Sequence, residues 1–390
     1  MAQVIGWVRR KVNNLSMTKQ EIGTATVLVV LLYVSSAMMF FGMNFWLWSF
    51  EKGLKRSYTS ILIPSLGWAL LFFLSGFVHR LVQRYHGRPE NFFFWVCHEG
   101  VMLLFLIGLF DSLTGLFGMY AAVHVPVLLQ SALISTGPIW TYLLASFLYP
   151  ESQPSFSPLL LVVIACTAGG VALAMIPQAK NHNKNTYFSP PWIVIFLCAT
   201  ALFPLYNVLQ GRFLHKFSEC CSPFTAKIVM LTVETIVQLF LTIMYFPLDS
   251  LPFFGKCDSI QESWDMLLSS VRCIGTCPNN AGYMLVYVLG FWIRHLVFAY
   301  MNSYSPIVAA VTSQLTQPIN TFLLLLIPSW NVYGAAASWY YTMGCFFLLL
   351  VSTIVFVSWH LFNQQRRDAQ WGSTSETTVE TLMVDETNEK

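Results

Sequence analysis

The sequence predicts an all-α, polytopic membrane protein whose ten transmembrane helices form two inverted five-helix repeats. Of the 390 residues, 56% are hydrophobic and only 10% are charged, whereas a soluble domain carries roughly 25% charged residues. The apolar residues fall in stretches long enough to cross a hydrocarbon core of about 30 Å as helices. In addition, part of the second half repeats the first. This composition excludes a soluble enzyme, and the net charge of +3 is too small to indicate a nucleic-acid partner.

Each helix is predicted from an apolar run between charged or Pro/Gly-rich segments. The expected helices span residues 25–49, 59–81, 95–119, 126–148, 157–177, 191–211, 224–246, 282–303, 306–327 and 334–361. Most connections are too short to hold a soluble domain. The exception is the loop 247–281, in which the segment 259–270 is typical of a short amphipathic helix lying over a cavity mouth.

The distribution of positive charge predicts which side the ends of the chain occupy. Ten crossings place both termini on one side, and that side carries more Lys and Arg than the other. The positive-inside rule therefore favours a cytosolic segment 1–24 and a cytosolic tail 362–390. The tail is rich in Ser, Thr and Glu, which is typical of disorder. We identify no cleavable signal or transit peptide.

An internal repeat appears when the sequence is shifted by 180 residues. Positions 120–144 match positions 300–324 at eight of 25 sites, among them Tyr120 with Tyr300 and Pro138 with Pro318. Each repeat crosses the membrane five times, which is an odd number. The second copy, 178–361, must therefore enter the membrane from the side opposite to that of the first copy, 25–177. Inverted repeats of this kind enclose a cavity near the midplane and permit alternating access.

The repeated residues are candidates for gating. Pro138 and Pro318 are expected in the middle of helices, where proline removes a hydrogen bond and frees carbonyl groups. Such breaks are tolerated where they face protein or a water-filled cavity. The alternative is a purely structural kink. We place Tyr120 and Tyr300, at the ends of their helices, in the same gating group.

Charged residues within the apolar stretches are the main candidates for a substrate and proton pathway. A charge at the centre of a membrane helix costs about 2.5 kcal/mol or more unless it is paired or hydrated. The candidates of this kind are Glu99, Asp111, Lys227, Glu234 and Arg294. Glu99 is expected near a helix start, where it can reach the interface. A charged substrate that bridges Asp111 and Arg294, or a pair of the two that breaks as the halves move, is a hypothesis.

Helical spacing extends this candidate set. Thr114, Gly115 and Gly118 share a face with Asp111, which indicates either an approach path for substrate or a close packing contact. Lys227, Glu234 and Gln238 lie on one stripe of their helix. An acid as deep as Glu234 could exchange protons, the alternative being a structural network with its neighbours.

Neutral polar residues in apolar stretches also need partners. The candidates for the pathway, or alternatively for hydrogen bonds between helices, are Asn44, Gln130, Asn207, Gln314 and Gln317. His124, in a short lumenal turn, could titrate in an acidic lumen, and His295 lies beside Arg294.

Three of the nine cysteines lie in the long loop: Cys257, Cys273 and Cys277. An oxidising lumen permits a disulfide there, and we expect Cys257 to pair with Cys273 or Cys277. Zinc is disfavoured because a closed site takes four ligands and no His accompanies these cysteines. The sequence contains no P-loop, no dinucleotide-binding fingerprint and no metal-ligand motif, so no cofactor, no metal and no enzymatic activity are expected.

Several short motifs resemble a known family. These are Ala201-Leu202-Phe203-Pro204 with Arg212, Gln238-Leu239-Phe240 with Pro247 and Leu251-Pro252-Phe253, Asp111, and Met43-Asn44 with Tyr58. With the ten predicted helices and the Cys-bearing loop, they make residues 25–360 similar to the chloroquine-resistance-transporter-like family of the drug/metabolite transporter superfamily. The chain departs from the malarial members in the predicted helix 282–303, where they carry an acid near Ile293 and it has Arg294-His295.

The resemblance implies proton-driven export of small solutes, such as amino acids, short peptides or cationic drugs, from a vacuole or lysosome-like lumen to the cytosol. We therefore expect a secondary transporter whose partners are the solute, protons and the bilayer, and which is a monomer or weak dimer. One alternative is a nucleotide-sugar or phosphate-sugar exchanger of the same superfamily, which would use Lys227 and Arg294. The other is a membrane scaffold or receptor that does not transport.

Overall fold

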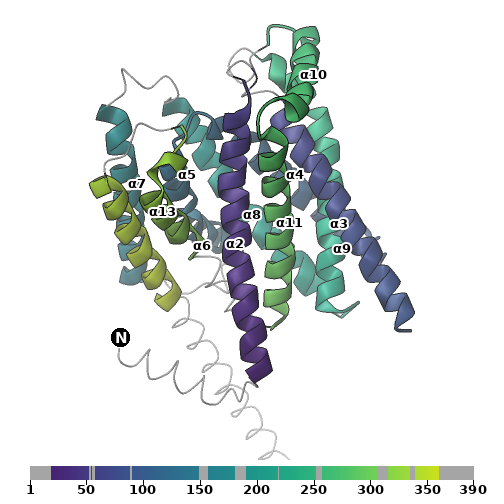
Figure 1. Ribbon diagram of the computed structural model, residues 1–390. Helices are drawn as coiled ribbons and strands as arrows, with labels where there is room; N and C mark the ends of the chain where they lie inside the picture. The colour runs from purple at the N-terminus through teal and green to yellow at the C-terminus, as the bar shows by residue number, and fades with distance from the viewer. Residues whose placement is uncertain are drawn as a thin grey trace, which may run out of the picture.

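The computed structural model describes residues 19–51, 54, 58–87, 90–148, 157–180, 190–217, 219–251, 257–304, 315–333 and 339–359. All regular structure in these ranges is helical, and most of the helices run along one common direction in an upright bundle (Figure 1). Nine of the described helices are long and apolar enough to cross a bilayer. The chain is thus built as a multi-pass membrane protein.

The first half contributes α2 (Lys19–Ser49), α3 (Thr59–Tyr85), α4 (His98–Ala122), α5 (Val127–Ile134), α6 (Gly137–Leu148) and α7 (Pro158–Lys180). The second half contributes α8 (Pro190–Lys216), α9 (Pro223–Met244), η3 (Phe246–Ser250), α10 (Ile260–Thr276), α11 (Asn280–Tyr304), α13 (Thr316–Leu326) and η4 (Pro328–Trp330). A last helix spans Trp339–Trp359.

The predicted helix at 126–148 is interrupted in the structure. Helix α5 ends at Ile134 and α6 begins at Gly137, so the span consists of two short helices. The ninth expected helix, 306–327, is described only from Thr316 to Leu326, and that part is too short to count as a span. The tail 362–390 lies outside the described residues.

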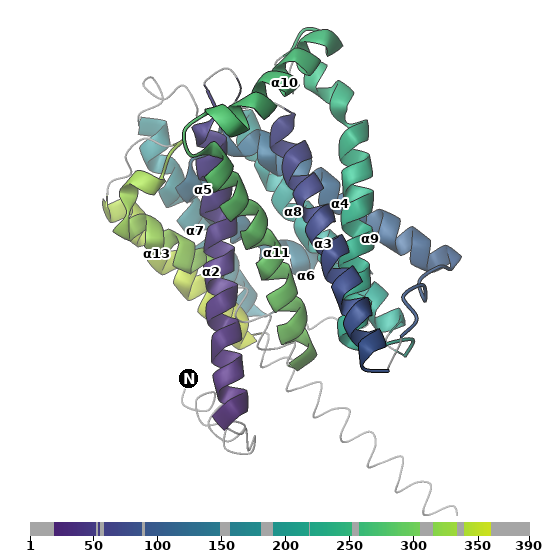
Figure 2. The same cartoon turned by 45° about the vertical axis from the view of Figure 1, so that its right-hand side comes forward.

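Helix α10 confirms the expected amphipathic helix of the long loop. Ser259 caps its N-terminus by accepting a hydrogen bond from the Glu262 amide. Ser263, Leu267 and Ser270 are spaced by four and three residues and form its buried face. The helix lies across one end of the bundle (Figure 2), which we call the α10 end. The α3–α4 and α8–α9 connections lie at the opposite end.

Helix packing follows a regular pattern. Helix α2 packs along α11, α4 packs along α8, and α3 packs along α9. The α2–α11 contact is close because Gly42 and Gly290 have no side chains: a Cβ on Gly290 would lie 2.5 Å from the Met39 amide nitrogen. Helix α7 contacts the last helix, where the hydroxyl oxygens of Thr167 and Ser352 are 2.7 Å apart.

Candidate functional site

A group of charged and polar side chains lies inside the bundle, between α4, α8, α9 and α11. Asp111 of α4 is 7% exposed, and Glu234 and Gln238 of α9 are 3% and 2% exposed. Tyr206 of α8 is buried with them. We call this set, together with Gln210, Lys227 and Arg294, the interior polar group.

Gly108 of α4 allows α9 to approach Asp111 closely, and Gly115 faces the same helix. A Cβ on Gly108 would lie 2.7 Å from the Val237 side chain and 3.0 Å from the Glu234 carbonyl oxygen. A Cβ on Gly115 would lie 3.8 Å from the Gln238 amide nitrogen. Small residues let membrane helices approach closely. The face predicted for Asp111 is therefore a packing face toward α9 that also carries the carboxyl group.

Glu234 is the best-connected acid of the interior polar group. The Gln210 amide donates a hydrogen bond to its carboxylate at 2.8 Å. Asp111 and Lys227 both interact with it electrostatically. Two acids and one base from different turns and helices therefore share one region of the membrane interior.

Among the described residues, Asp111 has no basic partner. Within the described ranges, no hydrogen bond or ion pair reaches its carboxylate, and its electrostatic neighbours are Glu234, Tyr206 and Tyr287. Thr114, expected on the same face, donates its hydroxyl to the Phe110 carbonyl of its own helix at 2.8 Å. Its hydroxyl is thus already used within α4.

Arg294 enters the same interior from α11. Its guanidinium lies 3.7 Å from the Met39 sulfur of α2 and interacts electrostatically with Tyr206. The described residues include no acid paired with it, and no ion pair joins it to Asp111. His295 stacks on Phe291 with ring centroids 4.0 Å apart, so it packs inside the protein.

Lys227 and Gln238 lie at the two ends of the α9 stripe. The Lys227 ammonium lies 5.3 Å from the centre of the Phe298 ring, which is a cation–π contact. The side-chain oxygen of Gln238 is buried and has no hydrogen-bond partner among the described residues. An unsatisfied buried oxygen at this place is a potential acceptor for a ligand.

The other neutral candidates bond mainly to protein. Asn44 and Gln130 form a reciprocal pair, with Gln130 donating to the Asn44 oxygen at 2.9 Å and to the carbonyls of Ala122 and Val125. Asn207 donates to the Phe203 carbonyl of its own helix. These contacts favour the structural alternative for Asn44, Gln130 and Asn207.

Gln317 joins the short helices of the two halves. Ser131 of α5 donates to Gln317 and lies 3.0 Å from the Thr321 hydroxyl, both in α13. Gln314 lies outside the described residues.

The expectation that Pro138 and Pro318 lie mid-helix is wrong. Pro138 is the second residue of α6, and Pro318 is the third residue of α13. Proline is tolerated in the first turn because the amide hydrogen it lacks would have no partner within the helix. Both prolines thus begin helices at corresponding places of the 180-residue repeat.

Tyr120 belongs to a second buried group at the α10 end. Its hydroxyl donates to the Asp249 carboxylate at 2.7 Å, and Asp249 is 1% exposed. The Tyr58 hydroxyl donates to the Thr242 carbonyl nearby. Sequence reasoning missed Asp249 because it follows the apolar stretch of α9. Tyr300, the repeat counterpart of Tyr120, is 38% exposed.

His124 is buried, not exposed in its turn. It is 6% exposed and stacks on Trp192 with ring centroids 4.9 Å apart. The start of α8 therefore covers the imidazole ring.

The predicted pairing of Cys257 is wrong. Cys273 and Cys277 form the disulfide, with Cα atoms 4.8 Å apart. They lie one helical turn apart, whereas about 20 Å of helix separates Cys273 from the start of α10. Cys257, before that start, is a buried thiol whose Sγ lies 3.9 Å from the Asp249 carboxylate. Burial raises the pKa of Cys257.

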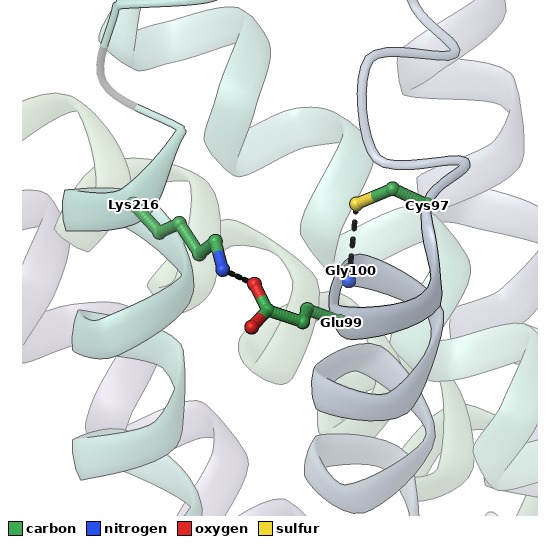
Figure 3. A network of polar contacts seen from close by, with 4 residues as sticks. All are labelled: Cys97, Glu99, Gly100 and Lys216. Atoms are coloured by element: carbon green, nitrogen blue, oxygen red, sulfur yellow. Dashed lines mark hydrogen bonds and ion pairs between the residues drawn. The ribbon is translucent and has the colours of Figure 1, made fainter.

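Glu99 lies at the opposite end of the bundle, as expected for an acid at the interface. It pairs with Lys216 at the end of α8, and Figure 3 shows the two side chains reaching toward each other. Cys97 caps the same helix start by accepting from the Gly100 amide. Both ionic side chains are well exposed, so this pair is a weak contact.

A hydrogen-bond network that the sequence did not indicate joins α3 to α9 at this opposite end. Glu90 accepts from the Ser222 hydroxyl at 3.0 Å. The Thr225 hydroxyl bonds to His79 and Gln83 of α3. Partial burial acts to raise the pKa of Glu90, but hydrogen bonds from Thr225, Ser222 and Gln83 outweigh it and hold the pKa below its usual value.

The described residues contain no group of three or more His, Cys, Asp or Glu side chains that could hold a metal ion. No family model and no curated protein matches the chain. A solved structure described only as "Crystal structure of protein" is similar at 15% sequence identity over 85% of this chain and 97% of that chain, with a TM-score of 0.41. That similarity is too weak to carry an argument about fold or function.

Proposed function

We propose that this protein is a secondary transporter that moves small solutes across an organelle membrane by alternating access. The observation that carries the proposal is the interior polar group. A buried charge in a membrane span is costly and by default a candidate for a transport pathway. Here acids and bases from α4, α9 and α11 lie in one region. Among the described residues, neither Asp111 nor Arg294 has an opposite charge beside it.

The proposed transporter consists of two inverted five-helix repeats. A two-fold axis between the halves would swap their first helices, α2 and α8, and their third helices, α4 and α11. The α2–α11 contact would then have the α8–α4 contact as its counterpart, and both contacts occur. The same axis would swap α3 with α9, and α7 with the last helix. The two members of each of these pairs are in contact with each other. This pattern and the 180-residue repeat support a two-fold relation between the halves, which is what alternating access needs.

The proposed driving force is a proton gradient from an acidic vacuole or lysosome-like lumen, with both termini in the cytosol. Two interacting carboxylates in a poorly solvated interior repel each other, and one proton bound to the pair lowers that cost. Asp111 and Glu234 form such a pair. Proton binding there, coupled to the movement of the halves, is the proposed coupling step. The resemblance to the chloroquine-resistance-transporter-like family is consistent with it.

Uptake by reconstituted protein tests this function. Proteoliposomes with an acidic interior, and matched ones without a gradient, are offered amino acids, short peptides, quinolines and nucleotide sugars. We expect gradient-dependent movement of at least one solute, and Glu234→Gln should abolish the dependence on the gradient. Glu99→Gln is the control because it removes an exposed acid. The proposal fails if no solute moves, or if both variants behave alike.

A second candidate is exchange of nucleotide sugars or sugar phosphates. The observation that favours it is the presence of two cations, Lys227 and Arg294, inside the bundle. Exchange of nucleotide sugars that does not respond to the gradient would support this candidate instead.

A further inference from the structure

Two acids occupy equivalent places at opposite ends of the bundle. Glu90 is the fifth residue after the end of α3, and Asp249 is the fifth residue after the end of α9. Helices α3 and α9 pack along each other in opposite directions. Helix α3 starts at the α10 end, where the Thr59 hydroxyl donates to the Leu267 carbonyl of α10. Asp249 therefore lies at the α10 end, and Glu90 lies at the opposite end.

Each acid caps the start of the partner helix. The Glu90 carboxylate accepts hydrogen bonds from the hydroxyl and the backbone amide of Ser222, the residue before α9, at 3.0 and 3.3 Å. The Asp249 carboxylate accepts a hydrogen bond from the backbone amide of Tyr58, the residue before α3. A carboxylate suits both places, because the first amides of a helix lack partners within it and carry partial positive charge.

The last turn of each helix adds a second bond to the start of its partner. Gln83, two residues before the end of α3, donates to the Thr225 hydroxyl in the first turn of α9 at 2.9 Å. Thr242, two residues before the end of α9, accepts from the Tyr58 hydroxyl through its carbonyl. We call Asp249, Tyr58 and Thr242 the Asp249 latch, and Glu90, Gln83, Ser222 and Thr225 the Glu90 latch.

The two repeated tyrosines each reach one latch. Tyr120, at the end of α4, donates its hydroxyl to the Asp249 carboxylate at 2.7 Å. Tyr300, its counterpart in the 180-residue repeat, lies at the end of α11 with its ring centre 6.3 Å from that of Phe224, two residues after Ser222. The third helix of each half therefore contacts the latch at one end of the bundle.

Both latches join the first half of the chain to the second, because α3 belongs to residues 25–177 and α9 to residues 178–361. Alternating access moves one half against the other, so that the halves separate at one end while they stay together at the other. Contacts that cross between the halves at an end must break when that end opens. Hydrogen bonds to a carboxylate are roughly twice as strong as bonds between neutral groups, which makes the two acids the main hold at these places.

We propose that the Asp249 latch and the Glu90 latch are the two gates of the transporter, one at each end of the bundle, and that they open in turn. The inference rests on the proposed transport function and adds gating residues to it. Asp249 and Glu90 act by holding helix ends together and do not touch the solute. Both latches are formed in this structure, so the α3–α9 pair is fastened at both ends.

Amide hydrogen exchange in lipid nanodiscs, read by mass spectrometry, tests this inference without any solute. The amides of residues 58–62 report on the Asp249 latch, and those of residues 222–226 report on the Glu90 latch. In Asp249→Asn, which loses the charge and one acceptor oxygen, we expect the 58–62 amides to exchange at least about fivefold faster than in wild type. The 222–226 amides should exchange at least about twofold slower, because a shift toward opening at one end depletes the state that is open at the other.

Glu90→Gln should give the mirror result, with faster exchange at 222–226 and slower exchange at 58–62. Tyr120→Phe removes one donor to Asp249 but keeps the carboxylate, and it should act like Asp249→Asn to a smaller extent. It replaces that variant if thermal unfolding in detergent shows that Asp249→Asn is not folded. Asp258→Asn and Glu219→Gln are the controls. They remove exposed acids that precede α10 and α9, and each should change either reporter by less than about twofold.

Three results overturn the inference. Faster exchange at the mutated end without slower exchange at the other end would show that each acid is a static helix cap. Faster exchange at both ends would show a general loss of stability, and unchanged exchange at the mutated end would show that the acid does not hold the helices together. The transport function fails separately: if exchange is reciprocal but no solute of the panel enters proteoliposomes, that function is wrong and the two latches remain.

Discussion

The Gln210 side chain donates a hydrogen bond to the Glu234 carboxylate at 2.8 Å, joining α8 to α9 inside the membrane span. It is the one hydrogen bond to that carboxylate in the part of the chain that the structure describes. The interaction holds the buried acid in a defined orientation next to Asp111. A candidate coupling residue is thus positioned by a neutral amide on a neighbouring helix.

We expect Gln210→Leu to destabilise the protein by about 1–3 kcal/mol, because a buried acceptor is left without its donor. The measurement is thermal unfolding of the purified protein in detergent. Asn207→Leu, one turn away on α8, is the control and should cost less, since the Asn207 amide bonds to the Phe203 carbonyl of its own helix. Equal losses in the two variants would show that the Glu234 contact adds nothing.

Gly290→Ala tests the close contact of α2 with α11. An added Cβ would lie 2.5 Å from the Met39 nitrogen and 2.9 Å from the Met38 carbonyl carbon. Backbone atoms cannot yield as a flexible side chain can, so the helices must separate at a cost of about 1–3 kcal/mol. Unfolding in detergent measures it. Gly282→Ala, on the same helix, meets nothing within 4 Å and should be neutral or slightly stabilising; a similar loss there would argue against the predicted clash.

The Glu90 network predicts a pH dependence of stability. The pKa of Glu90 is lowered in the folded state, so its contribution is fully present above the ordinary glutamate value of 4.5 and is lost as the pH falls through the lower, folded value. We expect the difference in Tm between wild type and Glu90→Gln to be largest near neutral pH and to vanish in acid. Ser222→Ala should show the same trend, and a difference that grows on acidification would contradict it.

The cysteine arrangement predicts a labelling order with iodoacetamide. Cys97 and Cys220 are exposed and should react in the folded protein. Cys257 is 2% exposed and burial raises its pKa, so it should react only after denaturation. Cys273 and Cys277 should require a reductant as well. Peptide mass spectrometry reads each site, and a peptide that links Cys257 to either partner would restore the pairing expected from sequence.

The sequence alone determined the membrane class, the positions of most helices and the amphipathic helix of the long loop. These are local properties: hydropathy over about 20 residues and the spacing of apolar residues along one helix depend on nearby residues only. Asp111, Glu234 and Arg294 could be named for the same reason, since a charge stands out in an apolar stretch.

Only the tertiary structure decided which of these residues meet and what they meet. Gln210 reaches Glu234 across 24 positions, Asn44 reaches Gln130 across 86, and Tyr120 reaches Asp249 across 129. Such contacts depend on how each helix is rotated and how closely it packs against its neighbours. Glycines such as Gly108 and Gly290 decide the packing distance, because they have no side chain to hold the adjacent helix away. The disulfide between Cys273 and Cys277, in place of one to Cys257, likewise followed from where α10 begins and ends. A helix fixes the distances between its residues, whereas the sequence alone does not tell how far apart two cysteines of a loop lie.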